Sequence, residues 1–454
     1  MTGRKKICLF SAALVVMLLE TGSTKIAAAE KPACSPTLAT LRLKSEGGFI
    51  KDSYGRVVLL RGANVPMQSY ADEHFTDRDL QTLASFGFNF IRLGISWDKA
   101  EPKEGQYNRQ YLDAIRDFAA RAGKYGIYVM PEVHKFGWCQ PGSDMPAWMC
   151  KDAPKHGLNS YGMLLAAKSF WRTPALQDKL IDFWLVLVNE FQGLDNVMGY
   201  NCLNEPIDSS MLFPGAFDKM LFPFYGRWIE AIRKADPSVM AVLEPSTINM
   251  LIPMVPPKFP YQNIVYAPHP YFIHTYSGGK LIIVQHESMS GLTKKYARID
   301  REAKKLNAPL LIGEYGGPPE IDFASNWLVK SLELQDKYFA SASIWAYDRF
   351  DTGWDIVDSK GKPKPFFWKE LRRPYPRFTA GRPGELLYSP DTGSFSYAYS
   401  PDLGIKAPTE IFLSRELAKR SVNVQGAEWS YNDTRQVMCL TANPGSEQVK
   451  VTVK

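Results

Sequence analysis

Short, continuous apolar segments alternate with longer amphipathic ones over most of the chain. Continuous apolar segments are typical of strands covered on both faces, and amphipathic stretches are typical of the helices that cover them. This order predicts an α/β fold, a (β/α)8 or TIM barrel. The predicted strands are Val57–Gly62, Asn89–Leu93, Ile127–Val133, Val197–Leu203, Val239–Leu243, Ile264–Tyr266, Leu310–Ile312 and Ser343–Trp345. The predicted helices include Gln110–Tyr125, Ala175–Phe191, Phe217–Lys234, Gly291–Lys305 and Ala324–Tyr338.

The pattern changes on either side of the predicted barrel. Before it, Leu41–Leu60 is predicted to form a hairpin that turns at Asp52–Gly55 and continues into the first barrel strand. After Arg372, short alternating segments separated by Pro and Gly turns predict a β-sandwich. Its predicted strands are Glu385–Tyr388, Ser394–Tyr399, Glu410–Leu413, Gln436–Leu440 and Glu447–Val453. We therefore expect residues 30–372 to form the barrel and residues 373–454 to form a second domain.

Residues 1–29 have the pattern of a secretory signal peptide. Three basic residues precede an apolar segment, Ile7 to Leu19, and Ala27–Ala29 supply small residues for cleavage before Glu30. The apolar segment has 13 residues, fewer than the ~20 that a membrane-spanning helix needs. An uncleaved anchor is the alternative. The prediction is a cleaved signal and a secreted or extracytoplasmic protein.

Five cysteines follow the predicted signal: Cys34, Cys139, Cys150, Cys202 and Cys439. Disulfides persist in secreted proteins, and an odd number leaves at least one cysteine unpaired or bonded to another chain. Cys139 and Cys150 lie in one Gly- and Pro-containing loop and could be linked, but the sequence leaves this pairing open. Since there is no CxxC pair, no metal site is expected, and the sequence suggests no other cofactor.

Charge and composition narrow the range of partners. The whole chain has a net charge of +7, of which Arg4, Lys5, Lys6 and Lys25 against Glu20 contribute +3, so the mature chain carries about +4 (7 − 3). This charge is spread out, with no basic stripe, which argues against a nucleic-acid partner. We expect a monomer, and the sequence leaves open a transient contact with a membrane surface.

Two glutamates stand where a barrel enzyme would carry its chemistry. Active sites of such barrels lie at the carboxyl ends of the strands, and Glu205 and Glu314 follow the fourth and seventh predicted strands. Glycoside hydrolysis uses two carboxyl groups on either side of the scissile bond: ~5–5.5 Å apart for retention and ~6.5–9.5 Å apart for inversion. The sequence does not fix this distance. With two carboxylates so close, the pKa of one is expected to rise, and that group serves as the acid.

The segments around these glutamates, Leu203–Pro206 and Ile312–Gly316, resemble the two signature segments of glycoside hydrolase family 5. The resemblance extends over roughly Leu41–Arg372 and includes Gly87–Arg92 and Glu101–Tyr107. Residues of the expected types stand in order at the strand ends. They are Arg92, His134, Asn204, Glu205, His269, Tyr271, Glu314 and Trp345.

The resemblance implies a retaining β-glycosidase and a role for each of these residues. Glu205 would be the general acid/base and Glu314 the nucleophile. Arg92 and Tyr271 would keep Glu314 ionised, and Asn204 would bind the sugar 2-hydroxyl. His134 and His269 would line the floor, and Trp345 would lie beneath the reacting sugar. Each residue alone also has a structural interpretation, such as a core histidine or a packed tryptophan, and it is their joint occurrence that favours the site.

The C-terminal segment resembles the sandwich appended to endoglycoceramidases, on Arg373–Pro376, Ala380–Gly381 and Tyr388–Phe395. This resemblance implies a glycolipid substrate. Apolar loop segments fit a lipid aglycone, although they would equally suit packing against barrel helices. They are Met211–Pro214, Met220–Phe224 and Met250–Pro257. One position departs from the group, because His134 is followed by Lys135–Phe136 instead of Gln-Asp, which puts sugar specificity at that subsite in question.

The sequence therefore predicts a secreted glycosidase that cleaves the β-linkage between a glycan or sugar and a lipid, by double displacement. A β-glucanase or cellulase acting on polysaccharides is the first alternative, and an oligosaccharide would then be the substrate. A carbohydrate- or lipid-binding protein with an inactive site is the second, and the presence of both glutamates argues against it.

Overall fold

The computed structural model describes residues 34, 41–66, 75–139, 142–151, 161–272, 274–277, 280–283, 287–349 and 353–454. The predicted signal, residues 1–29, lies outside the described residues. Among those that are described, no helix combines the length and the apolar character needed to cross a membrane.

A sheet of eight parallel strands forms the barrel, in the order β12-β13-β4-β5-β6-β7-β8-β9. A parallel bridge between Tyr266 and Leu310 joins its two ends, so the predicted fold class is confirmed. The strands are β4 (Arg61–Pro66), β5 (Phe90–Ile95), β6 (Tyr128–Val133), β7 (Gly199–Asn201), β8 (Met240–Leu243), β9 (Ile264–Tyr266), β12 (Leu311–Tyr315) and β13 (Ser341–Ile344).

The first barrel strand is the one that the sequence misplaced. Val57–Val58 was expected to begin it, but these residues form β3, which pairs with a strand of the C-terminal region. The apolar run from Val57 to Leu60 is continuous because it is buried on both sides of a crossing from one sheet to another, so hydrophobicity alone could not show where one sheet ends.

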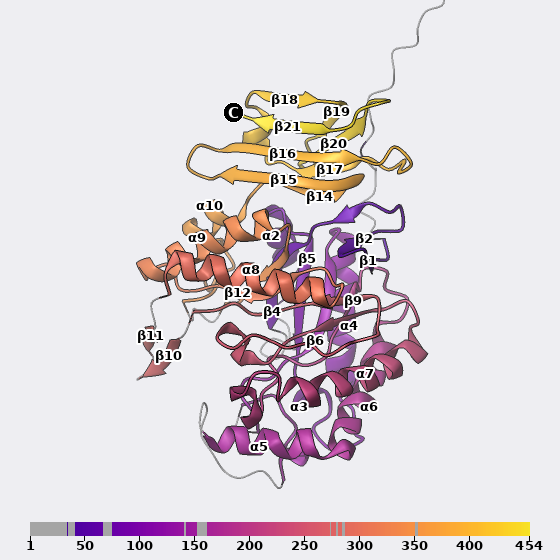
Figure 1. Ribbon diagram of the computed structural model, residues 1–454, viewed down its shortest axis with the longest axis vertical. Helices are drawn as coiled ribbons and strands as arrows, with labels where there is room; N and C mark the ends of the chain where they lie inside the picture. The colour runs from indigo at the N-terminus through magenta and orange to yellow at the C-terminus, as the bar shows by residue number, and fades with distance from the viewer. Residues whose placement is uncertain are drawn as a thin grey trace, which may run out of the picture. The chain divides into compact units, whose positions relative to one another are not determined.

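Helices cover the barrel, and their ends carry recognisable signals. Asn108 and Ser288 cap α4 and α8 by accepting a backbone N–H with their side chains, and Pro174 begins α6. The five predicted helices are all present to within two residues at each end. The helices of this region are α2 (Asp77–Ser85), α3 (Trp97–Ala100), α4 (Arg109–Lys124), α5 (Tyr161–Arg172), α6 (Pro174–Phe191), α7 (Asp218–Ala235), α8 (Met289–Lys305), α9 (Asp322–Lys337) and α10 (Pro365–Leu371). Strands β10 (His274–Ser277) and β11 (Lys280–Ile283) form a separate hairpin (Figure 1).

Two antiparallel sheets lie beside the barrel. Their strands after residue 372 are orange to yellow in Figure 1, and three strands before the barrel, in indigo, complete the larger sheet. The larger has the order β1-β2-β3-β14-β17-β20-β19 and the smaller the order β15-β16-β21-β18. The hairpin predicted near residue 50 is therefore part of the larger sheet. The strands are β1 (Lys44–Glu46), β2 (Phe49–Lys51), β3 (Val57–Val58), β14 (Tyr375–Thr379), β15 (Gly381–Ser389), β16 (Ser394–Pro401), β17 (Thr409–Phe412), β18 (Val422–Gln425), β19 (Ala427–Asn432), β20 (Val437–Ala442) and β21 (Val449–Val453), with a short helix, α11 (Arg415–Ala418). Strands β14, β18 and β19 were not predicted.

The larger sheet packs against the amino ends of the barrel strands. Tyr375 and Arg377 on β14 both donate to the carbonyl of Gly87, just before β5. Gly87 has φ +88°, and a Cβ there would lie 2.3 Å from the Phe412 ring, so only glycine allows this close contact. The carboxyl end of the barrel is thus left for the site.

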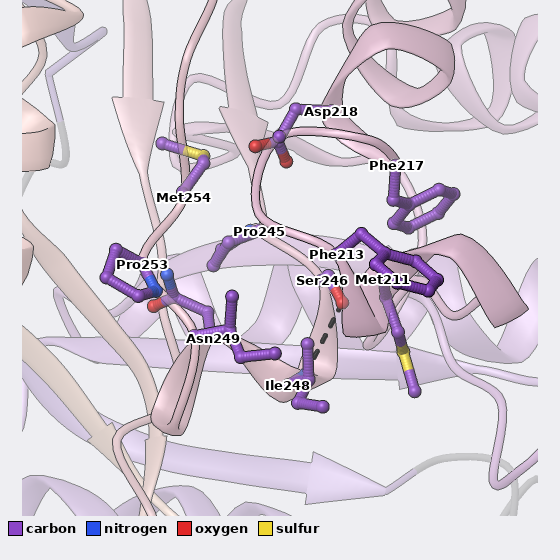
Figure 2. A pocket seen from close by; sticks show the side chains of 12 residues that line it. Met211, Phe213, Phe217, Asp218, Pro245, Ser246, Ile248, Asn249, Pro253 and Met254 are labelled. Carbon is purple, nitrogen blue, oxygen red and sulfur yellow. Dashed lines mark hydrogen bonds between the residues drawn. The ribbon is translucent and has the colours of Figure 1, made fainter.

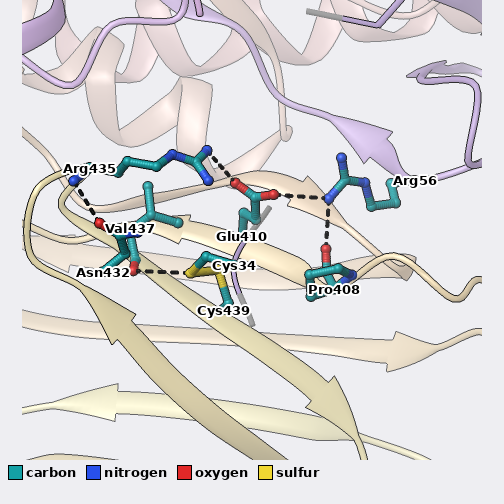
Figure 3. Close-up of a disulfide and its surroundings, with 8 residues drawn as sticks. All are labelled: Cys34, Arg56, Pro408, Glu410, Asn432, Arg435, Val437 and Cys439. Carbon is teal, nitrogen blue, oxygen red and sulfur yellow. Dashed lines mark hydrogen bonds and ion pairs between the residues drawn. A yellow bond between two sulfur atoms is a disulfide. The ribbon is translucent and has the colours of Figure 1, made fainter. Parts of the chain in front are cut away.

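Two disulfides join cysteines within the described residues. Cys139–Cys150 confirms the pairing that the sequence left open. Cys34–Cys439 links the segment before β1 to strand β20, beside the Arg56–Glu410–Arg435 ion pairs (Figure 3). Among the described cysteines, Cys202 is unpaired and buried.

Candidate active site

The eight residues predicted for the site come from six strand ends and meet at the carboxyl end of the barrel. Arg92 lies on β5, Glu314 on β12, and the others follow β6, β7, β9 and β13. Hydrogen bonds link Arg92 to Asn204 and Glu314, His269 to Glu205, and Tyr271 to Glu314, and the ring of His134 stacks on Trp345.

Strand alternation explains why Arg92 faces the barrel interior. Ile91 and Leu93 pack with the helices, whereas Phe90 belongs to the cluster inside the barrel, so Arg92 follows Phe90 inward one layer nearer the mouth. Strand β12 reaches the same end by another route: a register irregularity between Ile312 and Tyr315 accompanies the inward turn of Glu314.

Arg92 is fully buried and uses every one of its N–H donors. Its Nη1 donates to Glu314 Oε1 at 2.7 Å and to Asn64 Oδ1 at 2.9 Å. Its Nη2 donates to Asn204 and Glu244 at 2.8 Å each, and its Nε to Asn201 at 3.1 Å. Since a guanidinium has a fixed planar fork, this arrangement sets the direction of Glu314 and Asn204.

One ring nitrogen of His269 faces both Glu205 and Glu314. The ring nitrogen Nδ1 is 3.2 Å from Glu205 Oε1 and 3.8 Å from Glu314 Oε2. An oxygen of each carboxyl and the histidine nitrogen all lie within 4.8 Å of one another. This separation suits retention rather than inversion, since the latter needs ~6.5–9.5 Å for a water molecule.

The proton of this group is held mainly by His269 in the free site. Burial would lower the pKa of His269, but the charges of Glu244 and Glu314 and the hydrogen bond with Glu205 raise it to about 9. Burial would raise the pKa of Glu205, but the hydrogen bond and charge of His269 lower it to about 2. The pKa of Glu314 is raised by burial despite the opposing charges of His269 and Arg92.

This ordering differs from the expectation that the acid/base carboxyl itself would have the raised pKa. The reason is the histidine, which the carboxylate-pair argument ignored. A base placed against Glu205 takes up the proton, so the pair holds one proton between them.

Glycine makes room for this histidine. A Cβ on Gly313 would lie 2.6 Å from His269 Nε2, so any other residue there would displace the ring. His134 is held separately: its Nδ1 lies 2.5 Å from Glu132, and its ring stacks on Trp345 at 5.2 Å between centroids. Glu132, interpreted as structural from the sequence, is buried 3.4 Å from Arg92.

Sequence reasoning missed three residues of the site: Glu244, Lys135 and Asn64. Glu244 is bonded to Arg92 and to the backbone N–H of Glu205. The sequence did contain a signal for Glu244. Glu244-Pro245 follows the fifth strand in the same way as Glu205-Pro206 follows the fourth. Lys135 was noted only as a departure from the relatives after His134, and for Asn64 a position near a strand end was the only indication.

Glu205, His269 and Glu314 could also offer ligands to a metal ion. However, the guanidinium of Arg92 already neutralises Glu314 at 2.7 Å, and the proton on His269 occupies the ring nitrogen that faces both carboxyls. The donor set therefore suits an acid/base pair better than a divalent cation.

A barrel whose mouth holds two carboxyls at this distance defines the class of the protein: it is a retaining glycoside hydrolase. Comparison with known proteins agrees. A family model described as cellulase, glycosyl hydrolase family 5, matches residues 52–351, and one described as the family 5 C-terminal domain matches residues 373–454. The chain belongs to glycoside hydrolase family 5.

Its relatives include endoglycoceramidases. Endoglycoceramidase I of Rhodococcus hoagii is 28% identical over 417 residues, which cover 84% of this chain and 81% of that protein. The solved endo-glycoceramidase II of Rhodococcus sp. has a TM-score of 0.76 and 25% identity as a lactosyl-enzyme intermediate, covering 89% of this chain and 99% of that one. A complex of the same enzyme with ganglioside GM3 also has a TM-score of 0.76 at 25% identity, covering 90% and 99%.

Proposed function

We propose that this enzyme hydrolyses the β-glycosidic bond between a glycan or single sugar and a ceramide-like lipid, by double displacement. The observation that carries the proposal is the Glu205–His269–Glu314 group, in a chain that matches endoglycoceramidases over most of its length. Membership of glycoside hydrolase family 5 establishes the reaction class, and the lipid substrate is the part that we propose.

In this mechanism Glu314 attacks the anomeric carbon. Arg92 Nη1 and the Tyr271 hydroxyl, which lies 3.1 Å from Oε2, each donate to its carboxylate. Both interactions favour the ionised form and fix the direction of attack.

Glu205 delivers the proton to the leaving oxygen. Its side chain is 31% exposed in the free site, and substrate would cover it. Loss of water raises the pKa of a carboxyl, so binding favours transfer of the proton from His269 Nδ1 to Glu205 Oε1, over 3.2 Å. After the lipid alcohol leaves, the Glu205 carboxylate removes a proton from the water that attacks the ester.

The remaining residues hold the sugar. Asn204 Nδ2 donates one hydrogen to the Lys135 carbonyl at 2.9 Å, and its second hydrogen suits the 2-hydroxyl. Trp345 is only partly buried and stacks with His134, so it offers an aromatic face to the apolar side of a sugar ring.

The loops beyond the acid/base strand suit the lipid. Met211, Phe213, Phe217, Ile248 and Met254 line a pocket between the loops that follow β7 and β8 (Figure 2). The neighbouring side chains Leu212, Phe213, Leu251 and Val255 are 51–68% exposed. These apolar side chains lie on the loops that begin after Glu205 and Glu244, where the aglycone of the substrate would lie, and they could also touch a membrane surface.

Secretion is part of the same proposal. The apolar segment Ile7–Leu19 supports it, and the two disulfides suit an oxidising compartment. Fractionation of the producing cells and N-terminal sequencing test this proposal. We expect the protein outside the cytoplasm with Glu30 as its first residue, and protein that keeps Met1 would overturn the cleaved signal.

A substrate panel in detergent tests the activity. Lactosylceramide, glucosylceramide and galactosylceramide would be compared with cellulose, laminarin and aryl glucosides, with released sugar and ceramide measured separately. We expect cleavage of at least one glycosylceramide into sugar and intact ceramide. Cleavage of polysaccharides alone would replace the lipid substrate by a β-glucan, the function that the cellulase family model also accommodates.

A further inference from the structure

The backbone of Glu205 adopts a conformation that its own sequence disfavours. Its φ is +44°, in the left-handed region that costs a residue with a side chain about 1–2 kcal/mol. The next residue is Pro206, which restricts the residue before it to extended conformations. A residue strained in both ways persists only where its surroundings hold it.

Two charged side chains hold the backbone of Glu205, one at its N–H and one at its carbonyl. The N–H of Glu205 donates to Glu244 Oε2 at 2.7 Å, and Lys135 Nζ donates to the carbonyl of Glu205 at 2.7 Å. Hydrogen bonds to ionised groups are shorter and about twice as strong as those between neutral groups. Glu205 is therefore gripped at its amide and at its carbonyl.

Each partner is itself fixed. Glu244 Oε1 accepts from Arg92 Nη2 at 2.8 Å, and the Lys135 backbone carbonyl accepts from Asn204 Nδ2 at 2.9 Å. The Lys135 ammonium also lies 5.4 Å from the centroid of the Trp138 ring. The loops after β6, β7 and β8 are thereby joined around one residue.

The burial of Lys135 needs a compensating role. Its residue exposure is 2%, and an apolar side chain would fill that space without loss of hydration. Burial lowers the pKa of Lys135 to about 8, against the charges of Glu205, Glu244 and Glu132. The contact of its ammonium with the Glu205 carbonyl is the interaction that a methionine could not make.

We propose that Lys135 and Glu244 are positioning residues that clamp the Glu205 peptide in its left-handed conformation and so hold the acid/base carboxyl against His269. The proposal rests on the acid/base role given to Glu205 above. Neither residue is placed to touch the reacting atoms. Lys135 acts through Glu205, whereas Glu244 also contacts Arg92 and lies near His269. Loss of the Lys135 contact should therefore resemble a partial loss of the acid/base and spare the nucleophile.

The test compares substrates that differ in their need for an acid. Lactosylceramide has a poor leaving group, whereas 2,4-dinitrophenyl β-lactoside departs without protonation. For Lys135→Met we expect kcat/KM to fall about 10- to 100-fold on lactosylceramide and to stay within about threefold on the aryl lactoside. Azide should raise the kcat of this variant on the aryl lactoside and yield the β-lactosyl azide, because azide can attack the glycosyl ester without a general base, whereas water cannot.

Matched variants separate the clamp from general damage. Lys135→Gln can still donate to the carbonyl and should recover part of the loss. Glu244→Gln should lower kcat/KM more on lactosylceramide than on the aryl lactoside, with some loss on both because Glu244 also holds Arg92. Lys234→Met, at the exposed C-terminal end of α7, should behave as wild type. Thermal unfolding of each variant establishes that it is folded. If Lys135→Met does not fold, the comparison is made with Lys135→Gln.

Glu205→Ala distinguishes this proposal from the proposed function. It should show a larger loss on lactosylceramide and the same azide product. If Glu205→Ala shows neither, the acid/base assignment fails. If Glu205→Ala behaves as expected but folded Lys135 variants lose activity equally on both substrates, or lose none, the clamp alone is overturned.

Discussion

The two ends of the barrel both bury ion pairs, but with opposite ratios of charge. At the carboxyl end one guanidinium, that of Arg92, faces Glu132, Glu244 and Glu314 at 2.7–3.4 Å. At the amino end the ratio is reversed, because one carboxylate there faces two guanidinium groups. The first arrangement has more acids than permanent cations, and the second has the opposite.

Asp336 shows the amino-end arrangement. It accepts from Arg61 at 2.8 Å and from Arg373 at 2.5 Å, and all three side chains are at most 10% exposed. In the adjoining sheet Glu410 likewise accepts from Arg56 and Arg435 (Figure 3). Arginine stays charged at any accessible pH, so the positive charges of these clusters are permanent.

The difference teaches where proton chemistry can occur. An excess of carboxylates cannot all stay ionised at low dielectric unless a further positive charge is present, and His269 supplies it by taking up a proton. The carboxyl end of the barrel therefore has a proton that can be transferred, whereas the ion pairs at the amino end contain only permanent positive charges. The same residue types serve catalysis at one end and stability at the other.

The strongest test of this comparison is Glu314→Gln. We expect kcat to fall by at least ~10⁴-fold, as for the loss of other catalytic nucleophiles. We also expect unchanged or higher thermal stability, because one of the crowded carboxylates has lost its charge. Activity on 2,4-dinitrophenyl β-lactoside and the unfolding temperature measure the two effects. Turnover near the wild-type rate would remove Glu314 from the mechanism.

Asp336→Asn should give the reverse result. Removing the charge leaves two buried guanidinium groups without a counter-ion, which costs about 3–5 kcal/mol of unfolding free energy. The kcat of the folded variant, measured well below its unfolding temperature, should match wild type. The control is Asp113→Asn, which removes the exposed Arg109–Asp113 pair and should cost no more than about 1 kcal/mol. A wild-type unfolding temperature for Asp336→Asn would show that the Arg61–Asp336–Arg373 cluster does not stabilise the fold.

The smallest expected effect is in the pH profile of His269→Gln. In wild type, kcat/KM should fall at alkaline pH as the pair with Glu205 loses its proton, in keeping with the His269 pKa of about 9. Without the histidine Glu205 must hold that proton alone, so the alkaline limb should move to lower pH. The measurement is kcat/KM for lactosylceramide as a function of pH. An alkaline limb at the same pH in wild type and His269→Gln would contradict a proton shared by His269 and Glu205.

The same proton also affects stability. The pKa of His269 rises from 6.5 to about 9 on folding, so bound proton favours the folded state. This contribution is complete below pH 6.5 and is lost as the pH rises through 9. Denaturant unfolding of wild type and His269→Gln across this range would show it as a difference that shrinks at alkaline pH.

The sequence by itself determined the barrel, the order of its strands and the residues that meet at its mouth. Strand ends such as Asn204-Glu205 and Gly313-Glu314 could be recognised because a parallel barrel brings all its carboxyl ends to one rim, whatever the details of packing. Local periodicity likewise predicted five helices to within two residues.

Only the tertiary structure decided the rest, because it depends on contacts between residues far apart in sequence. The pairing of β3 with β14, the Cys34–Cys439 bond and the ratio of acids to arginines at each end arise between segments that no local pattern connects. The left-handed backbone of Glu205 is stabilised by Lys135 and Glu244, 70 and 39 residues away, against the preference of its own dipeptide. A sequence can state which groups are present, but the position of a proton depends on which of them are buried together.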